Sequence, residues 1–179
     1  MSPAPARRTR PRPALLHDND ASLMRLKTSY SAREVAALTG LTARQLQGWD
    51  AARIFRPAIA PRRTAQGGFT ERRYTPVDVL ELLALAELRR RGFTPAALGR
   101  LMVTLRDYFR RRLSETLDDA GEMRLLTNGR GLFLRTRQGH VFDLLVDPTQ
   151  PLITGEGLSL VPVSGRARRK RPARKGVRS

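Results

Sequence analysis

Apolar positions recur at helical spacing through the first two thirds of the chain, and each such stretch opens with a capping signal. Ser31 and Glu34 are spaced as a capping box, and so are Thr42 and Gln45. Gly40 stands between the two stretches and can end the first helix in a left-handed conformation. The pattern therefore predicts two short helices in a tight helix-turn-helix.

A basic hairpin is predicted after the second helix. Ile59 and Phe69 flank a Gly-Gly turn, and arginines lie on both sides of it, namely Arg62, Arg63, Arg72 and Arg73. A hairpin next to a helix-turn-helix is a wing, whose arginines can contact phosphates or enter a minor groove. A mobile basic loop is the alternative interpretation.

Two further helices are predicted, because Thr75 and Thr94 each precede a proline, a combination typical of a helix start. The first is apolar on too many sides for a surface helix and is expected to be buried. The arginines at 89–91 are interpreted as cations at its C-terminal end. The apolar stripe of the second helix continues to Leu117, so we expect a long helix, or a broken pair of helices, that offers a dimer contact.

The pattern changes from helical to strand-like at residue 123. Asn128-Gly129, a strong hairpin signal, separates two apolar segments, and further apolar segments follow at 141–146 and 158–163. Residues 123–163 are therefore expected to form a small antiparallel sheet. They carry no cofactor motif, and oligomerisation, ligand sensing and protein docking all remain open as roles for this module.

Composition excludes several function classes. The 179 residues include no cysteine and only two histidines, which excludes thiol catalysis, disulfides and cysteine-based zinc sites, and makes a histidine-built metal centre unexpected. No nucleophile and base can be assembled into a catalytic set, so no enzyme activity, cofactor or metal is expected. No apolar run approaches the roughly 18 residues of a membrane span, and a cytoplasmic, nucleoid-associated protein is expected.

The formal net charge of +18 predicts an affinity for polyanions. Residues 1–22 and 164–179 are arginine-rich and offer almost nothing to bury, so we expect disordered basic arms. Arg168, Arg169, Lys170 and Arg171 are candidates for nonspecific DNA contacts through counterion release. Solubilising tails are the alternative. Between the arms, the excess of basic residues lies before residue 113, so the first half is the expected nucleic-acid face.

An ordered set of residues resembles the DNA-binding domain of MerR-type transcription regulators over about residues 30–105. The set comprises Tyr30 to Leu46, Trp49-Asp50, Pro57, Arg72-Arg73-Tyr74-Thr75, Asp78 and Arg91-Gly92-Phe93-Thr94. The resemblance implies a winged helix-turn-helix that binds a near-palindromic promoter element as a twofold dimer.

The second helix and the wing supply the candidate DNA contacts. Arginine pairs bidentately with guanine and glutamine with adenine, and Arg44, Gln45 and Gln47 point outward in the predicted helix. The resemblance assigns recognition-helix contacts to Thr42, Arg44 and Gln47, and backbone contacts to Arg72 and Tyr74. Gln47-Gly48 stands where the family usually has arginine and tyrosine, the wing is longer than usual, and metal sensing is not implied because cysteine is absent.

The predicted fold class is mainly α with a small β module. It comprises a basic arm (1–22), a MerR-like winged helix-turn-helix domain with a linker helix (28–118), a small antiparallel sheet (123–163) and a basic tail (164–179). The predicted function is a dimeric, sequence-specific transcription regulator on double-stranded DNA, with RNA polymerase or another protein as a possible partner of residues 123–163. Two alternatives stay open: an architectural or replication-associated DNA-binding protein, and an antitoxin-like adaptor that holds a protein through its sheet.

Overall fold

The computed structural model describes residues 27–61, 67–68, 71–153 and 158–165. Its helices are α2 (Ala32–Thr39), α3 (Ala43–Ala51), α4 (Pro76–Arg90) and α5 (Pro95–Val103), followed by a π-helical turn (Thr104–Tyr108) and a 3-10 turn (Leu113–Thr116). Its strands are β1 (Tyr30–Ser31), β2 (Arg73–Tyr74), β3 (Met123–Thr127), β4 (Leu132–Thr136), β5 (Val141–Asp143), β6 (Pro151–Leu152) and β7 (Val161–Pro162). The predicted arms and Arg62, Arg63, Arg168, Arg169, Lys170 and Arg171 lie outside the described residues.

Reciprocal hydrogen bonds at the two predicted capping boxes form the helix-turn-helix. The Ser31 hydroxyl accepts from the Glu34 amide at 3.3 Å, and the Glu34 carboxylate accepts from the Ser31 amide at 2.9 Å. The Thr42 hydroxyl accepts from the Gln45 amide at 3.1 Å, and the Gln45 side chain accepts from the Thr42 amide at 2.8 Å. Gly40 ends α2 with a φ of 74°, a value that glycine adopts without strain. The predicted helix-turn-helix is therefore confirmed.

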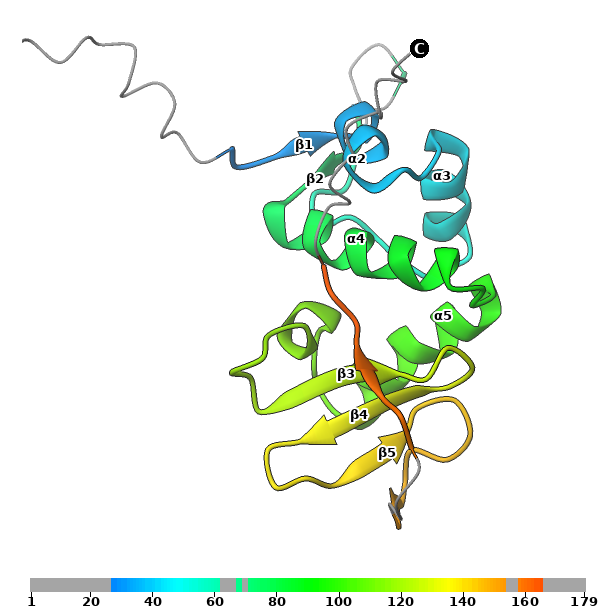
Figure 1. Cartoon of the computed structure of the whole chain (residues 1–179). Coiled ribbons are helices and arrows are strands. Elements are labelled where there is room, and N and C mark those ends of the chain that lie inside the picture. Colours follow the sequence, from blue (N-terminus) through cyan, green and yellow to red (C-terminus); the bar gives the residue numbers. More distant parts are fainter. Residues whose placement is uncertain (1–26, 62–66, 69–70, 154–157, 166–179) are drawn as a thin grey trace, which may run out of the picture.

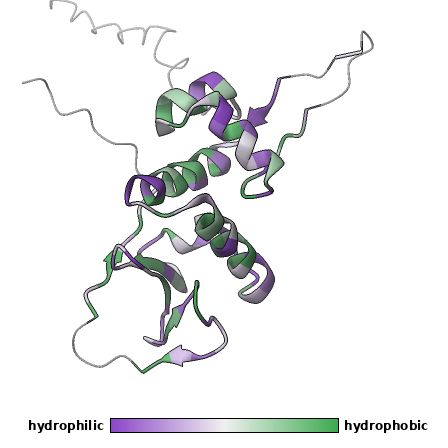
Figure 2. Ribbon diagram, turned by 90° about the vertical axis from the view of Figure 1, so that its right-hand side faces the viewer, coloured by the Kyte–Doolittle hydropathy of each residue, from purple (hydrophilic) through white to green (hydrophobic). Residues whose placement is uncertain are grey.

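Helix α4 lies between the helix-turn-helix and the sheet (Figure 1). Thr75 caps its start, Pro76 occupies its first turn, and much of its surface is buried, as the sequence predicts. Figure 2 shows it as a mainly apolar helix in the middle of the molecule.

The three arginines at the end of α4 have structural roles. Arg89 donates to the Phe93 carbonyl, Arg90 donates to the Thr39 carbonyl at 3.3 Å, and Arg91 pairs with Glu87. The interpretation of these cations as stabilisers of the C-terminal end of the helix is confirmed.

Of the two predicted forms, the structure contains the broken pair of helices and not one long helix. Helix α5 ends at Val103, the π-helical turn follows, and Arg110 takes a φ of 54° in the loop before the 3-10 turn. The apolar stripe instead belongs to the core of its own chain, because Leu98, Leu101, Leu105 and Leu113 are buried there with residues of the sheet. We therefore no longer expect these leucines to form a dimer contact, because they already pack within their own chain.

The predicted antiparallel sheet is confirmed, with the strand order β6-β5-β4-β3-β7. The β3–β4 turn uses Asn128-Gly129: the Asn128 side chain accepts from the amides of Arg130 and Gly131 at 3.0 and 2.7 Å, and Gly129 has a φ of 87°.

Alternation along the strands divides the apolar residues of the sheet between its two faces. Leu125, Leu132, Leu134, Leu144 and Val163 belong to the same core as α4 and α5, whereas Leu126, Phe133 and Val141 form a smaller cluster with Leu160. One continuous core thus joins the helix-turn-helix to the sheet, and the division into residues 28–118 and 123–163 stays a prediction from the sequence. No helix within residues 27–61, 67–68, 71–153 and 158–165 is long and apolar enough to cross a membrane.

Candidate nucleic-acid interface

Helix α3, here called the recognition helix, has one buried face and one exposed face. Leu46 and Trp49, three positions apart, are buried in the core. The predicted contact residues Thr42, Arg44, Gln45 and Gln47 are all exposed. The inner face therefore fixes the helix while the outer polar face stays accessible.

The four exposed side chains differ in whether they already form hydrogen bonds within the chain. Thr42 and Gln45 form the capping box, so the side-chain oxygen of each already accepts a backbone amide. Within the described part of the chain, no hydrogen bond or ion pair engages the side chain of Arg44 or Gln47. Arg44 and Gln47 are therefore the two side chains whose full hydrogen-bonding capacity is available to a partner.

The base of the predicted wing is attached directly to the recognition helix. Arg72 donates from Nε to the Asp50 carboxylate at 3.0 Å, and this half-buried ion pair joins the residue before β2 to the end of α3. Arg73 donates to the Ser29 hydroxyl at 2.9 Å and pairs across an antiparallel bridge with Ile59. The bridge is consistent with the start of a hairpin, whose outer part lies beyond the described residues.

Tyr74, a predicted DNA contact, is buried in this structure. Only 1% of this residue is exposed, and its ring packs in the main core between α2 and α4. Burial raises the pKa of the Tyr74 hydroxyl, because the charged form would lose its hydration. The ring fixes β2 to the core and leaves little of the side chain accessible to a phosphate.

Asp78 completes the cap of α4 and also holds the segment that leads into the wing. Its buried carboxylate accepts from the Thr75 amide at 2.8 Å and from the Ala58 amide at 3.0 Å. The sequence signal for the first bond was the capping position. The second bond, to a residue 20 positions earlier, had no local signal.

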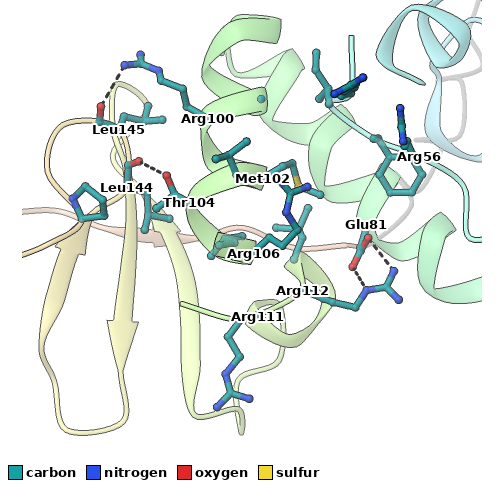
Figure 3. A pocket seen from close by; sticks show the side chains of 18 of the residues that line it. Arg56, Glu81, Arg100, Met102, Thr104, Arg106, Arg111, Arg112, Leu144 and Leu145 are labelled. Atoms are coloured by element: carbon teal, nitrogen blue, oxygen red, sulfur yellow. Dashed lines mark hydrogen bonds and ion pairs between the residues drawn. The ribbon is translucent and has the colours of Figure 1, made fainter. Parts of the chain in front are cut away.

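Glu81 joins α4 to the 3-10 turn, a connection that sequence reasoning missed. Its buried carboxylate accepts from Arg112 at 3.2 and 3.3 Å (Figure 3). It also accepts from the amide and hydroxyl of Ser114 at 3.2 and 2.8 Å. Arg112 also lies 3.6 Å from Asp78. A buried glutamate on an apolar helix was the available signal, since such a charge requires partners.

Comparison with known proteins identifies the first module. Residues 30–105 match the family model described as MerR HTH family regulatory protein. These residues form a MerR-type helix-turn-helix domain. The resemblance predicted from the sequence is thereby confirmed over the MerR-type domain, which comprises the recognition helix, the base of the wing, α4 and α5.

A crystal structure of a MerR-family transcriptional regulator from Bacillus cereus is similar to this chain at 21% sequence identity and a TM-score of 0.34. The match covers 42% of this chain and 52% of that chain, so the present chain spans about half the length of that structure. No curated protein matches the chain. The sheet lies outside the residues that match the family model.

The described residues contain no group of three or more histidine, cysteine, aspartate or glutamate side chains that could hold a metal ion.

Proposed function

We propose that the chain is a sequence-specific DNA-binding transcription regulator that acts as a homodimer. The observation that carries this proposal is the outer face of the recognition helix, where Arg44 and Gln47 are exposed and unengaged on a helix anchored by Leu46 and Trp49. The match of the surrounding residues to the MerR family supports the same conclusion.

In the proposed complex, the recognition helix enters the major groove. Arg44 pairs bidentately with a guanine, and Gln47 pairs with an adenine. The N-terminal end of the helix, with the Thr42 cap, faces a phosphate, because backbone amides and the helix dipole favour an anion there. Gln45 contributes mainly by holding this end of the helix in place.

Backbone contacts come from the wing and the basic arms in this proposal. Arg72 is held beside the recognition helix by Asp50, and Arg73 is held by Ser29 at the start of β1, so we expect their remaining N–H groups to contact phosphates. Arg62 and Arg63 extend this surface along the wing. Removal of residues 164–179, which include the cluster at 168–171, is expected to weaken binding to all DNA and to reduce its salt dependence.

We include a homodimer in the proposal, with an interface that does not use the buried leucines of the stripe. A twofold protein on a near-palindromic site presents one recognition helix to each half-site, which doubles the readout. The sheet module is left to interact with RNA polymerase or another protein. The proposal includes no catalytic step and no cofactor.

Genome-wide mapping of bound DNA at physiological salt, followed by footprinting of the recovered sites, tests this function. We expect discrete protected sites with twofold symmetry, and a dimer by light scattering. Spreading, cooperative protection without a shared sequence would overturn the proposal in favour of an architectural protein. Retention of a partner protein that requires residues 123–163, with no discrete DNA site, would favour the adaptor.

A further inference from the structure

A cavity of about 990 Å³ lies where the MerR-type domain meets the sheet, away from the outer face of the recognition helix. Its walls come from the loop after α3, from α5 and the π-helical turn, from the 3-10 turn and from the loop after β5 (Figure 3). We call it the arginine pocket, after the lining residues Arg53, Arg56, Arg100, Arg106, Arg111 and Arg112. Its volume lies at the upper end of the range usual for small-molecule sites.

The charge of the arginine pocket is strongly one-sided. Glu81 is the single carboxylate among its lining residues, and four hydrogen bonds from Arg112 and Ser114 already engage it. Arg106 and Arg111 pair with Asp107 and Glu122 outside the lining. The pocket therefore holds a surplus of positive charge that no lining group compensates.

Arg53 and Arg56 are the cations that remain available. Both are exposed, and no ion pair or hydrogen bond engages either side chain within the described part of the chain. Both leave the same short loop, whose Ile54 and Phe55 are buried between them. Two guanidinium groups on one fixed loop offer the fork-shaped donors that suit a carboxylate or a phosphate.

The remainder of the lining is largely apolar. Met102 and Val103 on α5 and Leu145 and Val146 after β5 face the same space, and Val103 and Val146 are 47% and 83% exposed. Arg100 crosses between these walls to donate to the Leu145 carbonyl at 3.3 Å. A ligand complementary to this surface carries an apolar body in addition to its negative charge.

The backbone at Arg53 has a left-handed conformation. Its φ of 56° lies in the left-handed region, where glycine is favoured and a long side chain is strained. A π-helical turn, a feature frequent at functional sites, forms another wall of the pocket. The left-handed turn also ends α3, because the Ile54 amide donates to the Trp49 carbonyl at 2.9 Å, and it fixes the backbone from which Arg53 enters the pocket lining.

We propose that the arginine pocket binds a small organic anion, with an aromatic or aliphatic body against Val103 and Val146 and a carboxylate or phosphate group on Arg53 and Arg56. This site is separate from the proposed DNA contacts, and its occupation requires no DNA. A phosphate of the DNA backbone shares the anionic chemistry but has no apolar body to fill the other half of the pocket.

Calorimetric titration of the full chain with 1-naphthyl phosphate and with inorganic phosphate tests the proposal. We expect saturable binding of one naphthyl phosphate per chain, tighter than that of inorganic phosphate. The double variant R53Q/R56Q is expected to bind naphthyl phosphate at least about tenfold more weakly, because charge-assisted hydrogen bonds are lost. The matched control R135Q/R137Q removes two exposed arginines of the sheet module and is expected to bind as the wild type does.

A single variant separates the ligand contact from the fold. Arg53→Gly relieves the left-handed strain, so it is expected to raise the midpoint of thermal unfolding while weakening naphthyl phosphate binding. Wild-type affinity in this variant, with its fold intact, would contradict a contact by the Arg53 side chain.

Three results would overturn the proposal. They are the absence of saturable binding, equal affinity for naphthyl phosphate and inorganic phosphate, and equal losses in R53Q/R56Q and in the control pair. A further titration uses a random-sequence DNA duplex. If R53Q/R56Q loses affinity for the duplex but binds naphthyl phosphate as the wild type does, the two arginines contact the DNA backbone and the proposal is overturned. None of these outcomes depends on whether the recognition helix reads sequence, which the mapping experiment decides separately.

Discussion

The recognition helix and the leucine stripe of residues 98–117 have the same kind of amphipathic pattern, but the fold uses them in opposite ways. The recognition helix buries Leu46 and Trp49 and leaves Arg44 and Gln47 without partners. The stripe has its leucines 98, 101, 105 and 113 buried in one core with residues of the sheet, so these side chains are not available to a second chain. An amphipathic pattern thus predicts which side is apolar, while the rest of the chain decides what covers it.

Shortening one buried leucine of the stripe is expected to have the largest effect, a loss of folding stability. Leu101 is fully buried, so Leu101→Ala is expected to reduce the free energy of unfolding by about 2–5 kcal/mol. Urea unfolding followed by circular dichroism measures the change, and Val103→Ala, at an exposed position of the same helix, is the control, with an expected change within about 0.5 kcal/mol. Unchanged stability of Leu101→Ala together with dissociation of a dimer would restore the stripe as a dimer contact.

Substitution on the recognition helix is expected to affect binding and leave folding intact. Arg44→Ala should weaken binding to the mapped site by about 1–3 kcal/mol and relax sequence preference, because one bidentate base contact is lost. Fluorescence anisotropy with the site and with a scrambled duplex measures both quantities. Arg137→Ala is the charge-matched control. Intact sequence preference in Arg44→Ala would mean that another element reads the bases.

Loss of the cap of the recognition helix is expected to have a smaller effect on stability. Thr42→Ala leaves the Gln45 amide without its acceptor and should reduce the free energy of unfolding by about 1 kcal/mol. Thr42→Ser keeps the hydroxyl and is expected to stay close to the wild type. Thermal unfolding of the two variants distinguishes the cap from a loss of packing, which would affect both.

The smallest effect concerns the start of α2. Hydrogen bonds from Lys27 and from the Ser31 amide lower the pKa of Glu34 to about 2 from 4.5. Because the folded pKa is depressed, the stabilisation by the charged form is complete above pH 4.5 and is lost as the pH falls towards 2. Glu34→Gln should lower the unfolding midpoint slightly at neutral pH. A difference from the wild type that persists unchanged at pH 2 would contradict this assignment.

Short-range signals account for the part of the fold that the sequence predicted. The caps at Ser31, Thr42 and Thr75 and the turn glycines Gly40 and Gly129 act within a few residues of themselves, so each was visible in the sequence. The outward direction of Arg44 and Gln47 followed from the helical period for the same reason.

Contacts between distant segments account for what the sequence did not reveal. The π-helical turn after α5 contacts the loop after β5, where the Thr104 hydroxyl donates to the Leu144 carbonyl at 3.4 Å. Segments far apart in the sequence also meet at the buried Tyr74, at the Asp50–Arg72 ion pair and in the lining of the arginine pocket. No local pattern specifies such pairings, although the buried charges of α4 indicated that partners existed.

Amide chemical-shift mapping of the full chain, titrated with a site recovered by genome-wide mapping, tests the central claim most directly. We expect the largest chemical-shift changes in residues 42–48 and around Arg72 and Arg73, with little change in β3, β4 and β5. Perturbations concentrated in the sheet or in the arginine pocket, with the recognition helix unaffected, would contradict it.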